Sequence, residues 1–300
     1  MTSNESDRRG FLAAGTAFSL GAVLTGVAAG QSPPPMVAAD RSGVPARASV
    51  MRILVVNANT SELVTEKVAG EARNVASPGT EIVAVTGTFG ARVIASRAEN
   101  AIAEHSLIAL VSEHAANCDA VVIGVSYDTG LRAARELLPI PVVGMTEAGL
   151  LTACMLGGRI GVIAFGRHTL PLYQELVASY GLSTRIAGWR VSESTAAFQR
   201  GAHDDLDREI VAAARSLIDQ DMAETVLITG AVMAGVPRRL QGDVPVPLID
   251  GLACGVRQAE LLVRLGLPKP RTGSYAAQTG RELIGVTPAV ARTFATPPGK

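Results

Sequence analysis

Apolar runs that recur at an almost constant spacing are the feature that most constrains how this chain folds. Residues 119–123 (DAVVI) correspond to residues 224–228 (ETVLI), 105 positions later, and residues 138–143 (LPIPVV) correspond to residues 244–249 (VPVPLI), 106 positions later. Short runs of this kind, separated by helical stretches, are typical of parallel strands buried on both faces. The sequence therefore predicts an α/β fold with two similar doubly wound parallel-sheet lobes, related by a pseudo-twofold axis, with a cleft between them.

The apolar runs of the whole sequence divide between the two halves of the chain. They cover 51–56, 81–86, 120–124 and 142–145 in the first half, and 159–165, 226–229 and 247–249 in the second. On this basis we assign residues 50–146 to lobe 1 and residues 147–249 to lobe 2. The amphipathic stretch 250–267 is expected to be a helix that can pack back on lobe 1. Residues 268–300, rich in Gly, Thr and Pro, are expected to form a loosely ordered tail.

Residues 1–29 have the order of features of an export signal. A twin-arginine motif, Asp7-Arg8-Arg9-Gly10-Phe11-Leu12, precedes a chargeless stretch that ends in Val27-Ala28-Ala29. This order predicts a cleaved twin-arginine signal peptide, and hence a periplasmic protein without membrane contact after cleavage. The alternative is an uncleaved membrane anchor, which the glycines within the apolar stretch disfavour. Residues 30–49, rich in Pro and Ala, are expected to be a disordered linker.

Charge and composition exclude several classes of protein. The chain has 27 basic and 27 acidic residues, whereas a general nucleic-acid binder needs an excess of Lys and Arg to neutralise phosphates. Three cysteines and four histidines argue against a disulfide scaffold and a metal site. The sequence has no GxxxxGK[ST] loop, and no GxGxxG follows its first strand, which argues against a nucleotide enzyme. We therefore expect a small-molecule substrate, with no nucleic acid, cofactor or metal; a homo-oligomer remains open.

Polar side chains gather where the first predicted strand ends and a helix begins. Asn57, Asn59, Thr60 and Ser61 follow the run 51–56. Asn side chains and the N–H groups at a helix start together form a suitable pocket for a carboxylate or an amide carbonyl, so these four residues are candidate substrate-binding groups. An ordinary polar turn with a helix cap accounts for the same residues equally well.

Three further loops at strand ends supply the other candidates. The candidate catalytic groups there are Ser126, Tyr127, Asp128 and His168. The additional candidate substrate-binding groups are Thr146 and Glu147. The alternatives are a helix cap for Asp128 and a solvated loop histidine for His168. Ser126 has no base near it in sequence, and a serine hydroxyl needs one to act as a nucleophile.

Several segments between Met51 and Leu267 form a recognisable set. They are 51–61 (MRILVVNANTS), 90–99 (GARVIASRAE), 119–124 (DAVVIG), 128–131 (DTGL), 141–148 (PVVGMTEA) and 233–235 (MAG). Together they resemble the aspartate/glutamate racemase superfamily, and most closely its hydantoin racemase branch. One departure lies in the opening segment, where Ala58 replaces the usual proline.

The resemblance implies two α/β lobes around a cleft, and cofactor-independent proton exchange at a carbon next to a carbonyl. It also implies two cysteines, one per lobe, on opposite faces of the substrate, because inversion requires removal of a proton from one face and its return to the other. These two family positions fall on Val125 and Gly230, again 105 residues apart, and neither side chain can exchange a proton. Moving Cys118, Cys154 or Cys254 to them would break the correspondence.

Three functions are consistent with these residues. The first is a hydantoin or amino-acid racemase-like isomerase with a rebuilt acid–base pair, which the resemblance favours and the missing thiols oppose. The second is a non-catalytic periplasmic binder of a small carboxylate or ureide. The third is a decarboxylase-like lyase on the same fold, for which one protonating group suffices.

Overall fold

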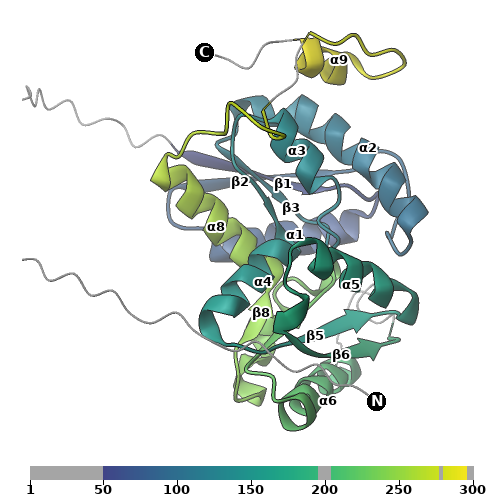
Figure 1. Cartoon of the computed structure of the whole chain (residues 1–300), viewed down its shortest axis with the longest axis vertical. Helices are drawn as coiled ribbons and strands as arrows, with labels where there is room; N and C mark the ends of the chain where they lie inside the picture. The colour runs from purple at the N-terminus through teal and green to yellow at the C-terminus, as the bar shows by residue number, and fades with distance from the viewer. Residues whose placement is uncertain (1–49, 195–203, 277–279, 296–300) are drawn as a thin grey trace, which may run out of the picture. The chain divides into compact units, whose positions relative to one another are not determined.

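Two parallel sheets with equivalent strand orders organise the protein (Figure 1). The computed structural model describes residues 50–194, 204–276 and 280–295, which belong to one compact unit. The first sheet has the strand order β2-β1-β3-β4 and the second has the order β6-β5-β7-β8. All neighbouring strands are parallel. The predicted α/β fold with two doubly wound parallel-sheet lobes is therefore confirmed.

Helices cover both faces of the two sheets, so most of the strands are buried apolar runs. The strands are β1 (Met51–Asn57), β2 (Thr80–Thr86), β3 (Ala120–Ile123), β4 (Val142–Gly144), β5 (Ile160–Phe165), β6 (Ile186–Ser192), β7 (Thr225–Ile228) and β8 (Leu248–Asp250). The helices are α1 (Glu62–Val75), α2 (Arg97–His114), α3 (Leu131–Leu137), α4 (Met145–Leu156), α5 (Leu170–Ser179), α6 (Asp204–Asp221), α7 (Val236–Leu240), α8 (Gly251–Leu265) and α9 (Pro288–Ala295).

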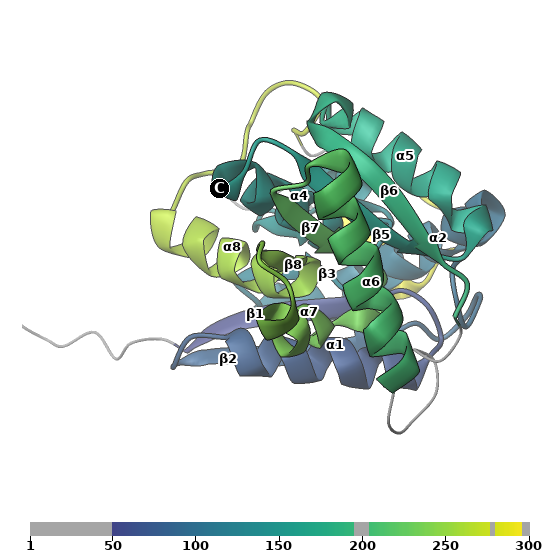
Figure 2. The same cartoon turned by 90° about the horizontal axis from the view of Figure 1, so that it is seen from below.

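Alternate side chains of β1 separate two apolar cores. Ile53 and Val55 pack with α1 and α8, whereas Leu54 and Val56 pack with α2 and α3. This alternation follows from the two-residue period of a strand. In the second sheet, α6 and α7 cover one face, and α4 and α5 cover the other. Figure 2 shows α6 crossing that sheet, and α7 next to α1 of the first lobe.

The helix that ends each set of four strands packs on the opposite sheet. α4 follows β4 but lies against β7 and β8, and α8 follows β8 but lies against β3 and β4. The two helices cross closely because small residues meet there: a Cβ atom on Gly251 would lie 2.5 Å from the carbonyl oxygen of Met145, and one on Gly149 would lie 3.2 Å from the Cα atom of Gly251. This exchange binds the two sheets together around their shared loops.

Several expectations concern the ends of the chain. The signal peptide (1–29) and the linker (30–49) lie outside the described residues. Part of the stretch expected to be a loosely ordered tail is helical: α9 packs on α2, and its Val290 side chain is buried. This short helix is ordered because it has an apolar face that packs on α2. Within the described residues, none of the helices is both long and apolar enough to cross a bilayer.

Candidate functional site

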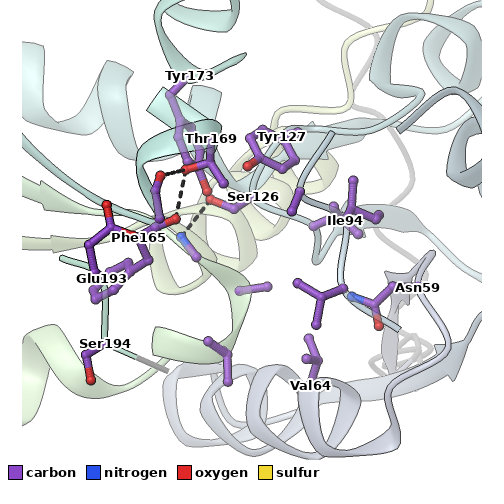
Figure 3. Close-up of a pocket in the computed structure, with 17 residues that line it drawn as sticks. Asn59, Val64, Ile94, Ser126, Tyr127, Phe165, Thr169, Tyr173, Glu193 and Ser194 are labelled. Atoms are coloured by element: carbon purple, nitrogen blue, oxygen red, sulfur yellow. Dashed lines mark hydrogen bonds between the residues drawn. The ribbon is translucent and has the colours of Figure 1, made fainter. Parts of the chain in front are cut away.

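A cavity of about 250 Å³ lies where the carboxyl ends of the two sheets face each other (Figure 3). The first lobe contributes Asn59, Val64, residues 93–95 and residues 125–127 to its lining. The second lobe contributes Phe165, Gly166, Thr169, Tyr173, Glu193, Ser194 and residues 230–232. Ligands of open α/β sheets bind at this edge, because the loops after the strands converge there.

The lining is largely apolar and carries little charge. Val64, Ile94 and Phe165 are among its apolar side chains, and Glu193 is the charged side chain among the described lining residues. Glu193 lies at the exposed rim, where its Oε1 accepts the Arg167 backbone N–H at 3.0 Å. A cavity of this character favours a small neutral ligand over a dicarboxylate, which would need a cationic partner.

A hydrogen bond between the two lobes closes one end of the cavity. The Gly230 N–H donates to the Ser126 Oγ at 2.8 Å, although the two residues are 104 positions apart. Ser126 is held in turn by the Thr146 hydroxyl, which donates to the Ser126 carbonyl oxygen at 2.6 Å. Ser126 therefore connects the loops after β3 and β7, and Figure 3 shows its hydroxyl beside the cavity.

Val125 and Gly230, to which the resemblance assigns the two cysteine positions, both line this cavity. Val125 is buried and aliphatic. Gly230 has a φ of +89°, a backbone conformation that side chains rarely adopt. Space is not the obstacle, since a Cβ atom there would meet its nearest neighbours, in Phe165 and Met233, at 3.6 Å. The loop after β7 thus lacks a thiol and also has a backbone suited to glycine.

Two tyrosines stand together beside Ser126. The rings of Tyr127 and Tyr173, one from each lobe, have centroids 4.6 Å apart. Burial, and then the neighbouring Tyr173, raise the pKa of Tyr127 well above its ordinary value. Burial also raises the pKa of Tyr173, although hydrogen bonding to Ser126, Thr229 and Tyr127 acts in the opposite direction. Both phenols therefore stay protonated at neutral pH and can donate hydrogen bonds to a ligand.

Asp128 and Thr146, which are buried, and the half-buried Glu147 form a cluster outside the cavity lining. The Asp128 carboxylate accepts the backbone N–H groups of Thr146 at 2.9 Å and Glu147 at 2.8 Å, and the Tyr180 hydroxyl at 2.7 Å. It thereby caps α4, the helix that follows the next strand. Glu147 forms an ion pair with Arg135. Burial raises the pKa of Asp128 to about 7, against the three hydrogen bonds, which lower it.

The polar side chains of the loop after β1 mostly form hydrogen bonds with one another and with the start of α1. The Asn57 Nδ2 donates to the Asn59 Oδ1 at 2.9 Å and to the Thr65 Oγ1 at 3.0 Å, and the Ser61 N–H donates to the Asn59 Oδ1 at 2.9 Å. Of the four residues that we assigned to substrate binding in this loop, Asn59 lines the cavity, whereas Asn57, Thr60 and Ser61 do not. The loop is thus a polar turn held by its own hydrogen bonds, with one residue, Asn59, at the cavity.

The second lobe contributes residues that the sequence did not single out. His168 is exposed and is not part of the lining, but Thr169 and Tyr173 are. The Thr169 hydroxyl is 2.8 Å from both the Phe165 and Gly166 carbonyl oxygens. The loop after β5 could be recognised from the sequence as one that faces the cleft. Within it we selected His168 and not its neighbour Thr169, because imidazole is the commoner catalytic group.

In the part of the chain that the structure describes, the cavity is lined by neither a cysteine nor a cluster of side chains that could bind a metal ion. Cys118, Cys154 and Cys254 are unpaired thiols, and they do not line the cavity. No group of three or more His, Cys, Asp or Glu side chains in the described ranges is arranged to hold a metal ion.

Comparisons with known proteins agree with this geometry. Residues 53–259 match the family described as Asp/Glu/Hydantoin racemase. The chain is 32% identical over 237 residues to the hydantoin racemase of Paenarthrobacter aurescens, covering 78% of this chain and 100% of that protein. It is 36% identical to the allantoin racemase from Pseudomonas fluorescens, with a TM-score of 0.75 over 78% of this chain and 100% of that one. The allantoin racemase from Klebsiella pneumoniae is 30% identical, with a TM-score of 0.74 over 78% and 96% of the two chains.

Proposed function

The chain belongs to the Asp/Glu/hydantoin racemase family, and on this premise we propose that it is a racemase-type isomerase for a small cyclic ureide. The reaction is proton exchange at the carbon next to a ureide carbonyl, and it proceeds without the thiol pair. The observation that carries the proposal is the cavity at the meeting point of the two sheets, whose described lining is uncharged apart from Glu193 at the rim. The relatives named for hydantoin and allantoin support the same ligand class.

The rebuilt acid–base set uses hydroxyl and carboxyl groups. Removal of the proton leaves an enolate, whose oxygen needs hydrogen-bond donors. The Tyr127 and Tyr173 hydroxyls are suitable donors because burial keeps them protonated. Glu193 is the proton acceptor in this proposal, since it is the carboxylate of the described lining. Figure 3 shows Glu193 and Tyr127 on different sides of the Ser126 hydroxyl. In this proposal Glu193 takes the proton from one face of the ring carbon, and the Tyr127 hydroxyl returns a proton to the other face. Solvent then removes the proton from Glu193 and reprotonates the Tyr127 phenolate.

A second candidate function is capture of the same ligand without turnover. The observation that favours it is the loss of proton-exchanging side chains at Val125 and Gly230, together with the positive φ of Gly230. The predicted twin-arginine signal over residues 1–29 agrees with either role in the periplasm, which is the compartment we propose.

Solvent exchange separates the two roles. Single enantiomers of 5-methylhydantoin and allantoin are incubated with the protein in deuterated buffer, and deuterium at the ring carbon is followed by NMR beside a protein-free control. We expect enantiomer loss and deuterium uptake above that control, and a rate lowered roughly 100-fold or more in Glu193→Gln. Exchange at the control rate with thermal stabilisation by the ligand supports capture. If the protein shows no exchange above the control and no stabilisation by either ligand, both roles are contradicted.

A thiol-restored variant provides the matched control. Val125→Cys combined with Gly230→Cys returns sulfur to both walls of the cavity. If the wild-type protein only captures its ligand, this variant should gain exchange where the wild type has none. The positive φ of Gly230 makes the second substitution strained, so Val125→Cys alone is measured beside it.

A further inference from the structure

Tyr127 borders two separate hollows. One is the cavity between the sheets, and the other is an outer pocket of about 300 Å³ between α2 and α5. The outer pocket is lined by Arg97, Asn100, Ala101, Glu104, Tyr127, Leu172, Glu175 and Leu176. We propose that the Tyr127 ring is the partition that sets the upper size of the ligand, and that removing the ring joins the outer pocket to the site. This inference rests on the proposed function for the ligand class alone.

The Tyr127 ring is held in place from both lobes. It follows β3 of the first sheet, but it packs against the ring of Tyr173 on α5, with centroids 4.6 Å apart. Its hydroxyl interacts with Thr169 and Tyr173, which also belong to the second lobe. The side chain is 9% exposed. The ring also belongs to the apolar core of the first lobe, so its displacement would break contacts with both lobes, and it therefore acts as a wall.

The outer pocket has the chemistry of a subsite for an arm with an amino end. Its apolar floor comes from Ala101, Leu172 and Leu176, which suit an alkyl chain. Its rim has the guanidinium of Arg97 against the carboxylates of Glu104 and Glu175, so the carboxylates outnumber the cation. Arg97 already forms an ion pair with Glu175. An ammonium group at the end of the arm therefore finds complementary charge there, and a carboxylate does not.

The test measures binding along two series of 5-substituted hydantoins. One series has n-alkyl arms, the other has ω-aminoalkyl arms, and both are lengthened one methylene at a time. We expect the affinity of the wild-type protein to fall about tenfold or more when the arm first exceeds the cavity. Tyr127→Phe keeps the ring and should keep this length limit. Tyr127→Ala should move the limit to longer arms and bind the first excluded arm at least about tenfold more tightly than the wild type does.

Two further variants sharpen the result. Tyr127→Leu retains part of the packing, so it should give an intermediate limit even if Tyr127→Ala unfolds. In the Tyr127→Ala background, Glu175→Gln should reduce the preference for amino over alkyl arms, because it removes one of the two rim carboxylates. A folded Tyr127→Ala or Tyr127→Leu protein with the wild-type length limit would overturn the proposal, as would a changed limit in Tyr127→Phe.

A series of n-alkylbenzenes separates failure of this inference from failure of the proposed ligand class. These probes enter apolar cavities without any recognition of a ureide. If no hydantoin binds the wild-type protein, the proposed function fails, and the alkylbenzene length limits of the wild type and Tyr127→Ala still test the partition. Equal limits in that series overturn the role of Tyr127, and a longer limit in Tyr127→Ala supports it.

Discussion

Asp128 is the residue at which local sequence rules and the three-dimensional structure differ most instructively. A carboxyl residue just before a helix usually caps that helix, but the N-cap of α3 is Gly130, and no side chain caps it. Asp128 instead caps α4, across the neighbouring strand. The approach is so close that a Cβ atom on Gly144 would lie 2.4 Å from the Asp128 Cγ. The sequence offered the residue type and its role, but only the packing of β3 beside β4 determines which helix it serves.

The buried Asp128 carboxyl group makes a pH-dependent contribution to stability. Burial raises its pKa from 3.8 to about 7, so the folded protein binds a proton that the unfolded chain has released in this interval. The contribution of Asp128 to the free energy of unfolding is therefore complete below about pH 4 and is lost as the pH rises through about 7. We expect the wild-type protein to lose stability relative to Asp128→Asn as the pH increases from about 5 to 8, measured by urea unfolding.

Tyr180→Phe provides the second half of this test. The Tyr180 hydroxyl donates to the Asp128 Oδ2 at 2.7 Å and lowers the pKa of Asp128. Its removal should raise that pKa further and shift the pH-dependent interval upward. A stability difference between the wild-type protein and Asp128→Asn that stays constant over this pH range would show that the carboxyl group does not titrate there.

At the scale of elements, the apolar runs of the sequence predicted each described strand except β6, including the half-buried edge strand β2 (Thr80–Thr86). The fully buried run of β3 (Ala120–Ile123) was visible as an apolar segment. β6 (Ile186–Ser192) was missed, because Gly188 and Arg190 interrupt its apolar pattern. The packing of α4 on the second sheet and of α8 on the first was not predictable in detail. An apolar face predicts that a helix packs on a sheet, but it does not identify which sheet.

α8 is fixed to the first lobe by one buried carboxylate. Glu260 accepts the Ser77 backbone N–H at 2.7 Å and the Ser77 hydroxyl at 2.8 Å, from the loop before β2, and the Thr80 hydroxyl at 2.7 Å, from the first residue of β2. Burial acts to raise the pKa of Glu260, but these donors and Arg257 outweigh it and lower that pKa. The stability that Glu260 provides is therefore present at neutral pH and is lost on acidification.

Glu260→Ala should lower the free energy of unfolding by about 2–4 kcal/mol at pH 7, because it leaves several half-buried donors without an acceptor. Urea unfolding followed by circular dichroism measures this loss. Arg264→Ala, at an exposed position of the same helix, is the matched control and should change stability by less than about 0.5 kcal/mol. Equal effects of the two substitutions would mean that α8 is held by its apolar face alone.

At the scale of the whole molecule, the site depends on contacts between residues that are far apart in sequence. Val125 and Gly230, which the repeat and the resemblance single out, both line the cavity, because equivalent positions of two similar lobes meet across it. Tyr173 was not predicted, since a tyrosine within α5 has no sequence signal that separates a lining residue from a core residue. Nor could sequence reveal the hydrogen bond from Gly230 to Ser126, which forms only when both lobes are folded.

A second link between the lobes joins α1 to α7. The Arg238 guanidinium donates to both oxygens of Glu71, at 3.1 Å and 2.7 Å. The Glu71 side chain is 3% exposed and that of Arg238 is 62% exposed. The two ends of this ion pair therefore differ in what their removal leaves behind. Without Arg238, a buried carboxylate loses its bidentate partner, whereas without the carboxylate the arginine can return to water.

This asymmetry gives a prediction for the connection of the two lobes. Arg238→Ala should destabilise the protein by about 1–3 kcal/mol at pH 7, measured by urea unfolding, because Glu71 remains buried with Asn74 as its other donor. Adding Glu71→Gln removes the buried charge, so the double variant should be more stable than the sum of the two single effects. Arg239→Ala, which breaks a pair whose carboxylate, Asp207, is more exposed than Glu71, should cost about 0–1 kcal/mol. Strictly additive effects of Arg238→Ala and Glu71→Gln would indicate that the pair does not couple the lobes.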